Sequence, residues 1–393
     1  MLQVTEASLT GRPAAASSKL EALRVLHLGK FYPPHPGGME THLQALCGEL
    51  QRSIKVSVVV AGDERKTRAE VIDGVQVTRA GTMLKLGATP VCPETVRLIR
   101  ETKPDIVHLH HPNPAAIVAY LASGHRGPSV FTYHSDIIRQ RMLRKVFWPL
   151  LRRALSRAAA IIVTSPNYLD TSPVLQRFRK RCHVIPFGIP LAPFDGTDTG
   201  AVAALRARYG PRIVLGVGRL VYYKGFAYLI RAMKDVAGHL LIVGKGPLRA
   251  ALEREARACG VSERVSILTD VADVRPYYHA ADVFALASVA RSEAFGIVQL
   301  EAMACGKPVV NTWLDSGVPF VSPDRETGLT VPPADATALS TAFNTLLDDP
   351  ALSAKYGRAG RRRVEQEFNV EVMAQRTLRL YEAVMNGQAR ESE

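Results

Sequence analysis

Two glutamates eight positions apart, Glu293 and Glu301, mark the part of the chain best equipped for chemistry. They stand in the stretch R-S-E-A-F-G-I-V-Q-L-E-A-M-A-C-G-K-P at residues 291–308. The apolar run after Gly296 predicts a helix, and Gly306 is expected to end it. A helix start presents unpaired N–H groups and the positive end of a dipole, which favour an anion. The pattern indicates a nucleotide-sugar site, with an ordinary buried helix that has a charged start as the alternative.

Two cations, Arg219 and Lys224, follow a predicted strand in G-V-G-R-L-V-Y-Y-K-G at residues 216–225. Doubly wound sheets bind their ligands at the carboxyl ends of the strands, where these cations are expected. Each charge-assisted hydrogen bond to a diphosphate would contribute about 1.5 to 3 kcal/mol. Two exposed cations on a loop are the alternative. Gly244, in V-G-K-G-P after the next predicted strand, leaves room for a flat group such as a nucleobase.

Short apolar runs that alternate with helical periodicity predict two tandem α/β units with parallel sheets. The first unit opens with a strand, a loop that contains Gly37 and Gly38, and a helix at 39–50, which is the start of a Rossmann-like fold. The motif G-x-G-x-x-G is missing from this turn, which weighs against a dinucleotide. Strands are expected at 23–28, 55–61, 106–109, 130–133, 160–164, 183–185, 213–217, 240–243, 265–268, 283–287 and 309–312. Helices are expected near 226–237, 248–259, 296–305 and 335–347.

The 393 residues suit two domains of ordinary size. Residues 1–22 predict a disordered leader with no secretory signal. Residues 23–190 form the first predicted domain, and residues 201–369 form the second. The Gly- and Pro-rich residues 191–200, which show no helical or strand period, form the linker between them. A last helix at 370–385, within residues 370–393, is expected to cross back to the first domain.

The composition is that of a folded cytoplasmic protein. Hydrophobic residues make up 47% of the chain and charged residues 22%, without an apolar run long enough to span a bilayer. The five cysteines are scattered, which argues against a disulfide framework or a structural zinc site. The net charge of +14 lies mostly in the first half, which indicates an acidic partner such as a phospholipid surface or a diphosphate. Nucleic acid is not expected, because no aromatic platforms interleave with the basic residues.

The histidine-rich stretch H-L-H-H-P-N-P at 108–114 places His108 and His110 on one side of a strand. Imidazoles are common metal ligands. Because no carboxylate stands nearby in the sequence, we expect a loop that lines an acceptor cleft in preference to a metal site.

A basic segment at 139–158 has apolar residues at helical spacing, and Pro149 is expected to kink it. Such a helix packs on its own domain or lies on an anionic membrane. The absence of acidic residues from 137 to 169 and the presence of Trp148 favour the membrane. The basic residues concerned are Arg141, Arg144, Lys145, Arg152 and Arg153.

Together, Arg219, Lys224, V-G-K-G-P and the E-x7-E pair resemble the retaining glycosyltransferases of family 4 over about residues 23–386. That resemblance implies the GT-B fold, in which two Rossmann-like domains face each other across a cleft. It implies that Arg219 and Lys224 hold the donor diphosphate, that Glu301 accepts hydrogen bonds from the ribose, and that Glu293 lies by the transferred sugar.

The resemblance extends to backbone groups and to one histidine. The backbone of Phe295, Gly296 and Ile297 would meet the sugar and phosphate, and Gly37 and Gly38 match a loop that closes on the diphosphate. His134, in T-Y-H-S-D after a predicted strand, matches a histidine close to the donor sugar, although a lone histidine at a strand end is more often structural.

The amino-acid sequences of these motifs are most similar to those of bacterial mannosyltransferases of polysaccharide assembly. This implies transfer from GDP-mannose to a glycan or a polyprenyl-diphosphate-linked acceptor on the inner face of the cytoplasmic membrane, with retention of configuration. No cofactor is expected, and because the chain lacks D-x-D, no metal ion is expected either. A UDP-sugar-dependent transferase and a nucleotide-sugar 2-epimerase of the same fold are the alternatives.

Overall fold

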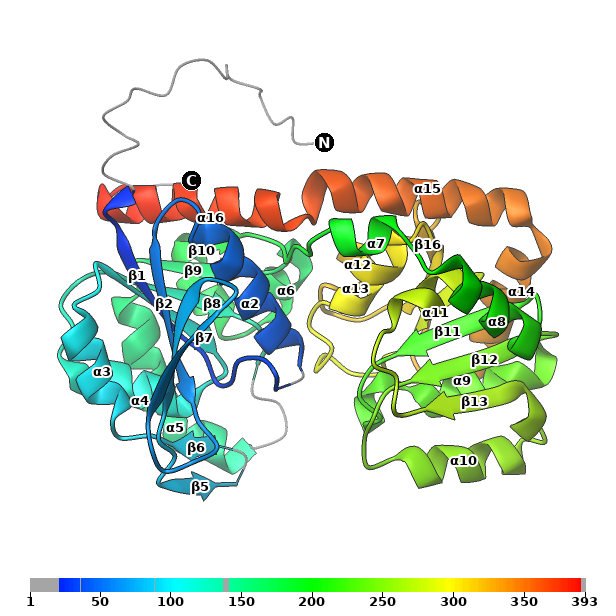
Figure 1. Cartoon of the computed structure of the whole chain (residues 1–393), viewed down its shortest axis with the longest axis horizontal. Coiled ribbons are helices and arrows are strands. Elements are labelled where there is room, and N and C mark those ends of the chain that lie inside the picture. Colours follow the sequence, from blue (N-terminus) through cyan, green and yellow to red (C-terminus); the bar gives the residue numbers. More distant parts are fainter. Residues whose placement is uncertain (1–20, 36, 88, 137–140, 390–393) are drawn as a thin grey trace, which may run out of the picture.

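The structure, a computed structural model, describes residues 21–35, 37–87, 89–136 and 141–389, with no side chains described for 141–146. Residues 1–20 of the predicted leader lie outside these ranges. The described chain forms two lobes side by side, joined by long helices along one edge (Figure 1).

The first lobe is built on an eight-stranded sheet with the order β10-β9-β8-β7-β1-β2-β4-β3. Neighbouring strands are parallel except for the antiparallel edge pair β3 and β4. Because helices cover both faces, the central strands are buried and read as continuous apolar runs. The strands are β1 (Arg24–Leu28), β2 (Lys55–Ala61), β3 (Arg68–Ile72), β4 (Val75–Ala80), β7 (Ile106–His111), β8 (Ser129–Tyr133), β9 (Ala160–Val163) and β10 (Cys182–Val184), with a separate hairpin of β5 (Leu84–Leu86) and β6 (Thr89–Val91).

The helices of this lobe begin at residues suited to helix starts. Asn113 and Ser165 accept hydrogen bonds from the backbone N–H groups of Ala116 and Tyr168, and a proline occupies the first position of each helix concerned. The helices are α2 (Gly38–Leu50), α3 (Thr95–Thr102), α4 (Pro114–Ser123), α5 (Arg141–Arg157), α6 (Pro166–Thr171) and the 3-10 helix η1 (Leu175–Arg181).

The second lobe is built on a fully parallel six-stranded sheet with the order β13-β12-β11-β14-β15-β16. In chain order this is 3-2-1-4-5-6, the Rossmann arrangement, and its strand order reverses between β11 and β14. The strands are β11 (Ile213–Val217), β12 (His239–Val243), β13 (Val265–Leu268), β14 (Val283–Leu286), β15 (Val309–Thr312) and β16 (Gly328–Val331).

Helices cover both faces of this sheet (Figure 1). They are α7 (Ala192–Asp195), α8 (Thr199–Tyr209), η2 (Tyr222–Lys224), α9 (Phe226–Ala232), η3 (Met233–Asp235), α10 (Arg249–Ala258), η4 (Ser262–Arg264), α11 (Arg275–Ala280), α12 (Ile297–Ala304), α13 (Val318–Val321), α14 (Ala336–Asp348) and α15 (Pro350–Glu367). The GT-B fold expected from the sequence is therefore confirmed.

The chain crosses between the lobes twice, and the two crossings pair with each other. Ile189 donates a backbone hydrogen bond to Phe368, and Val370 donates one to Ile189. The last helix, α16 (Val370–Met385), then packs against α2, and its apolar face joins the core of the first lobe through Met373, Leu380 and Val384, among others. Helices α15 and α16 run end to end along both lobes (Figure 1).

The segment predicted as the linker contains secondary structure that its lack of periodicity did not reveal. Residues 191–200 contain α7 and the first two residues of α8, which Asp198 caps by accepting from the N–H of Ala201. The clustered Gly and Pro residues concealed two short helices, because proline is accepted in a first helical turn and Asp is a preferred cap. Strands β3 to β6 and β16 and helix α15 were not predicted either.

Candidate active site between the lobes

The predicted donor-site residues follow the two strands at which the second sheet reverses its order. Arg219 and Lys224 lie after β11, and Glu293 lies after β14. The loops at such a point diverge and leave a crevice at the carboxyl ends of the strands. The fold therefore brings the two cations and the first acid of the E-x7-E pair to one place, although 69 residues separate Lys224 from Glu293.

Lys224 and Glu293 form an ion pair, with 2.5 Å between Nζ and Oε2. Their side chains are only 11% and 10% exposed. The hydroxyl of Ser288 donates a second hydrogen bond to the same carboxylate oxygen, at 3.1 Å. Burial raises the pKa of Glu301, and the charge of Lys224 is close enough to oppose that shift. Lys224 thus lies near both acids.

Two glycines create the room for Lys224. A Cβ added to Gly218 would lie 3.2 Å from Cε of Lys224, so a side chain there would crowd the lysine. A Cβ on Gly244 would lie 2.0 Å from the carbonyl oxygen of Gly218. Gly244 therefore permits close backbone packing between the loops after β11 and β12, and this contact explains the glycine without an open space for a nucleobase. Gly218 was missed by sequence reasoning.

The helix starts of the two lobes lie against each other. A Cβ added to Gly38, the first residue of α2, would lie 3.7 Å from Cδ1 of Ile297, the first residue of α12. Neither start has a side-chain cap. Gly37 adjoins this point from the first lobe and Gly296 from the second. Two positive helix ends therefore converge where the sequence predicted an anion.

Gly296 has φ +79° and cannot be replaced without strain. A Cβ there would lie 2.6 Å from Cδ2 of Leu286 in β14. Gly306, with φ +66°, follows α12 in the left-handed conformation, so the predicted end of this helix is confirmed.

Glu301 lies one turn into α12 and accepts a hydrogen bond from the hydroxyl of Tyr278, at 2.5 Å from Oε2. Burial raises the pKa of this carboxyl group, and the Tyr278 hydroxyl and the charge of Lys224 oppose that shift. Tyr278, in α11, is fully buried, so its hydroxyl binds the Glu301 carboxylate from the interior of the lobe.

Phe295 is a buried anchor, and only its backbone is available to a ligand. Its ring is 2% exposed and packs edge-on against Phe187 and Phe368, with ring centres 5.0 and 6.0 Å apart. Phe187 in turn contacts the ring of His134, 5.2 Å away between centres. The aromatic contacts from Phe295 through Phe187 to His134 therefore connect the two lobes next to the start of α12.

Arg219 is exposed and lines a pocket between the lobes. Ser135 and Asp136 contribute to this pocket from the first lobe, and Tyr223 and Ser292 contribute from the second. Arg219 is therefore accessible to a ligand that enters this pocket. Ser135 and Asp136 directly follow His134 in the chain.

Two charged residues of the first lobe, Lys30 and Glu40, also belong to this region but were not predicted. Burial lowers the pKa of Lys30, and the charge of Arg219 lowers it further while Glu40 raises it. Burial raises the pKa of Glu40, which Lys30 opposes. The carboxylate of Glu40 folds back toward Gly37 at the start of α2. Lys30 and Glu40 stand on either side of the predicted glycine loop in the sequence, and this placement could have identified them as site residues.

Arg291, the first residue of the E-x7-E stretch, fastens one lobe to the other. Its guanidinium donates to the carbonyl of Thr171 at 2.8 Å and lies 3.5 Å from the carboxylate of Asp136. It also stacks over the ring of Tyr168, 5.1 Å from the centre. Sequence reasoning gave Arg291 no role, because these partners stand more than 100 residues away in the chain.

His134 is buried, with 5% exposure, and its ring contacts Phe187 and His110. Its Nε2 is 3.1 Å from Nδ1 of His110. His108 and His110 belong to β7 and are buried, so the expectation that they belong to a loop lining an acceptor cleft is wrong. Strand β7 is central in the first sheet, and its polar residues face a buried cluster.

The basic helix α5 packs its apolar face on its own lobe. Phe147, Leu151 and Leu155 are buried in the core, and α5 contacts α4. Trp148 is half-buried against that core, with the guanidinium of Arg177 5.3 Å from its ring centre. It is therefore not the open anchor that the sequence suggested. The helix continues through Pro149 from Arg141 to Arg157.

The basic side chains of α5 are only partly described. Arg152 and Arg153 are exposed, whereas the side chains of Arg141, Arg144 and Lys145 lie outside the described residues. Among the helices in the described ranges, none is both long and apolar enough to cross a membrane.

The two-lobed fold and the site between the lobes are those of a GT-B glycosyltransferase. Residues 202–363 match the family model "Glycosyl transferases group 1", and residues 36–192 match "Glycosyltransferase Family 4". The chain belongs to the family 4 glycosyltransferases, and it is an enzyme of that class.

The relatives include several bacterial transferases of nearly the same length. The O-antigen chain mannosyltransferase C of Escherichia coli is 31% identical over 93% of this chain and 100% of its own length. A D-rhamnosyltransferase of Pseudomonas aeruginosa is 35% identical over 88% and 92% of the two chains. A GDP-mannose-dependent α-(1-6)-phosphatidylinositol monomannoside mannosyltransferase of Mycolicibacterium smegmatis is 34% identical over 84% and 91%.

Among solved structures, sucrose-phosphate synthase of Thermosynechococcus elongatus superimposes with a TM-score of 0.76 at 26% identity, over 93% of this chain and 99% of that one. Both lobes therefore take part in the similarity. The comparisons support a mannosyltransferase-like member of the family.

Proposed function

We propose that this enzyme transfers mannose from GDP-mannose to a hydroxyl group of a glycan or a polyprenyl-diphosphate-linked oligosaccharide, with retention of configuration. The observation that carries this proposal is the Lys224–Glu293 pair beside the start of α12 at the switch point of the second sheet. A donor diphosphate at that point meets Lys224, Arg219 and the two uncapped helix starts. Glu301, one turn further along α12, is suited to accept hydrogen bonds from the ribose.

Charge then accounts for the reaction. When the bond between the anomeric carbon and the phosphate oxygen breaks, the sugar gains positive charge and the diphosphate gains negative charge. Lys224, Arg219 and the helix starts stabilise the departing diphosphate. Glu293, near the sugar, stabilises the positive ring. The acceptor hydroxyl attacks from the leaving-group side, and its proton passes to the departing phosphate oxygen.

This division of work assigns neutralisation of the diphosphate to side chains and helix starts, so we propose transfer without a metal ion or cofactor. Incubation with a chelator and then with added Mg²⁺ or Mn²⁺ tests this part. Full activity in the chelator supports it, and activity that returns only with added metal contradicts it.

The donor is proposed from the relatives. One relative is named as GDP-mannose-dependent and another as a mannosyltransferase. A third is named as a D-rhamnosyltransferase and is 35% identical, which makes a D-rhamnosyl donor the second candidate. The choice between the two sugars depends on a single hydroxyl group, and a polar site can discriminate such a difference strongly.

Thermal-shift titration with GDP and UDP side by side tests the base, since a ligand that binds only the folded protein raises its melting temperature. We expect a larger shift with GDP. Turnover should then be compared among GDP-mannose, GDP-D-rhamnose, UDP-glucose and UDP-N-acetylglucosamine, with proton NMR of the product to read the anomeric configuration. Preference for a UDP-sugar, an inverted product, or donor epimerised without acceptor would each contradict the proposal.

We also propose that the acceptor is reached at an anionic membrane surface, on the inner face of the cytoplasmic membrane. The basic first half of the chain and the exposed Arg152 and Arg153 on α5 support this. Because the apolar face of α5 is used by its own lobe, the attraction is expected to be electrostatic and to weaken with salt.

A further inference from the structure

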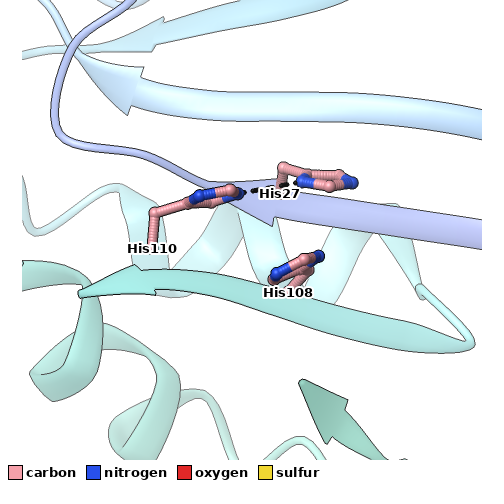
Figure 2. A group of neighbouring side chains, drawn as sticks. All are labelled: His27, His108 and His110. Carbon is pink, nitrogen blue, oxygen red and sulfur yellow. Dashed lines mark hydrogen bonds between the residues drawn. The ribbon is translucent and has the colours of Figure 1, made fainter. Parts of the chain in front are cut away.

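Five histidines with mutual ring contacts gather in the first lobe, and three of them come from its two central strands. His27 belongs to β1, and His108 and His110 belong to β7; all three are buried, with at most 4% exposure. Figure 2 shows their rings close together over the two strands, with a hydrogen bond between His27 and His110. Neither the donor site nor the fold requires histidine at three buried positions.

Hydrogen bonds join these rings into one chain that ends at His134. Nε2 of His134 lies 3.1 Å from Nδ1 of His110, and Nε2 of His110 lies 3.1 Å from Nδ1 of His27. Nε2 of His27 lies 3.4 Å from the hydroxyl of Tyr381 on α16. That hydroxyl lies 2.5 Å from Nδ1 of His108, whose Nε2 lies 2.7 Å from the hydroxyl of Thr132.

Every ring in this chain is neutral. Burial lowers the pKa of His110 to about 3, and burial lowers the pKa of His27, His108 and His134 well below the ordinary value. A neutral imidazole carries one N–H donor and one bare nitrogen acceptor. Each ring therefore donates one hydrogen bond and accepts one. The direction of the bond on one side of the ring fixes the direction on the other side.

This restriction links the tautomers. If His134 donates from Nε2, His110 must accept at Nδ1 and donate from Nε2, and the same holds at His27. The Tyr381 hydroxyl then accepts from His27 and donates to His108, which donates from Nε2 to Thr132. In the opposite arrangement all four rings carry the proton on Nδ1. Only these two arrangements satisfy every hydrogen bond and also give the proton of the buried Tyr381 hydroxyl an acceptor, since a hydroxyl that accepted from both rings would leave its own proton unpaired.

We propose that Tyr381, His27 and His110 are positioning residues that set which ring nitrogen of His134 carries its proton. Nδ1 of His134 is buried and lacks a hydrogen-bond partner among the described residues, so it is the free end of the chain. The next residues, Ser135 and Asp136, line the pocket between the lobes. Helix α16 thus contributes to the active site through Tyr381, which contacts His27 and His108 on the face of the sheet that α2 and α16 cover. The effect on transfer rests on the proposed role of His134 beside the donor sugar.

A metal centre explains the same residues less well. His27, His108 and His110, and likewise His42, His110 and His134, have ring nitrogens within 4.8 Å of one another. Neither set includes a carboxylate to offset a divalent charge in a fully buried site. His108 and His110 are stacked with an interplanar angle of 14°, so their rings lie face to face. The N···N distances of 3.1 Å are those of hydrogen bonds.

The chain of hydrogen bonds through the histidine rings can be tested by NMR. The enzyme is labelled with nitrogen-15 at histidine and measured without ligand. The ring-nitrogen shifts distinguish a protonated from a bare nitrogen, and single histidine variants assign the signals. We expect His27, His108, His110 and His134 to share one tautomer. A mixture in which neighbours differ would overturn the proposal, as would one equivalent of zinc in the purified enzyme with ring shifts typical of metal ligation.

Tyr381→Phe removes one oxygen and keeps the ring in place. We expect it to change the tautomer population at His134, three hydrogen bonds away, and to lower kcat about two- to tenfold as the competent fraction falls, with the donor KM changed less. The matched control is His42→Leu. His42 contacts the rings of His110 and His134, but its nitrogens have no hydrogen-bond partner among the described residues. It should leave the tautomers and kcat near wild type.

Circular dichroism and the melting temperature verify that both variants fold. Unchanged nitrogen-15 shifts at His134 in a folded Tyr381→Phe variant would overturn the proposal that Tyr381 helps to set the tautomer of His134. Failure of the proposed function gives a different result: shared tautomers persist, but His134→Ala transfers sugar at the wild-type rate.

Discussion

The ammonium group of Lys224 lies 2.5 Å from the carboxylate of Glu293, and both side chains are about nine-tenths buried. The cation that we propose for the diphosphate is thus neutralised by the acid that we propose for the sugar. In the proposed mechanism, a donor between the helix starts would supply a second anion for Lys224 and a developing positive charge for Glu293. The pair would then provide the two opposite charges that the transition state needs at separate places.

Replacing Lys224 with methionine should slow transfer by one to two orders of magnitude. Loss of one charge-assisted hydrogen bond costs about 1.5 to 3 kcal/mol, or about 10- to 150-fold in kcat/KM. Glu293 would also lose its ion-pair partner, so the melting temperature should fall. Steady-state kinetics and thermal unfolding measure the two effects separately.

The double variant Lys224→Met with Glu293→Gln is the control for that result. It removes both charges, and replacing a buried ion pair with neutral groups often restores stability. We expect the melting temperature to recover while activity stays lost. Near-normal turnover in Lys224→Met would remove the diphosphate role.

Glu293→Gln alone should slow transfer and leave donor binding nearly intact. The amide keeps the shape of the side chain but cannot stabilise a positive sugar ring, while Lys224 is released for the diphosphate. We therefore expect a lower kcat with an unchanged or lower KM for the donor, which initial-rate measurements separate. A rise in KM with unchanged kcat would reassign Glu293 to ground-state binding.

Glu301→Ala should mainly weaken donor binding, because its proposed partners are the ribose hydroxyls, away from the bond that breaks. Two hydrogen bonds to a charged group, at about 1.5 kcal/mol or more each, correspond to a rise in donor KM of at least about 150-fold. Tyr278→Phe is the matched variant, since it removes the hydroxyl that holds Glu301 and leaves the carboxylate present. It should raise KM less. Isothermal titration with GDP measures both, and wild-type affinity in Glu301→Ala would end the assignment.

The part of this site that the sequence could predict consists of short motifs whose local geometry is set by nearby residues. The end of α12 at Gly306, the strand β11 and the loop that carries Lys224 all follow from periodicity and glycine placement within about ten residues. The GT-B fold followed from the alternation of strands and helices together with the resemblance to a family.

The parts that could not be predicted depend on contacts between distant segments. The sequence offers no signal that Arg291 reaches Asp136 and Thr171, or that Tyr381 on the last helix bonds to His27 and His108. The apolar spacing in α5 fitted both a membrane face and a core face, and the position of α4 decided between them. These contacts depend on tertiary packing. The periodicity of one segment does not show which distant segment it packs against.

Binding to anionic lipid should depend on the exposed arginines of α5. Changing Arg152 and Arg153 to glutamine, together with Arg144 and Lys145, should reduce sedimentation with vesicles that contain phosphatidylglycerol, at about 1 kcal/mol for each charge near the surface. The same vesicles at high salt should give the same loss with the wild-type protein. Arg254→Gln with Arg257→Gln, on α10 of the second lobe, is the control for a general loss of charge. Equal binding by all variants would leave α5 as a helix of the core alone.

Gly38 and Gly296 adjoin the same point between the lobes, yet alanine should affect them differently. At Gly296, φ is +79° and the added methyl group would lie 2.6 Å from Leu286, so Gly296→Ala should cost about 1 to 3 kcal/mol and lower the melting temperature. At Gly38, the methyl group would meet only Ile297, at an ordinary contact distance of 3.7 Å. Gly38→Ala should therefore fold with wild-type stability and raise the donor KM, because the methyl group occupies the space between the two helix starts. Thermal unfolding and donor kinetics on this pair separate the need for backbone freedom from the need for room. A wild-type KM in Gly38→Ala would mean that the diphosphate does not approach α2.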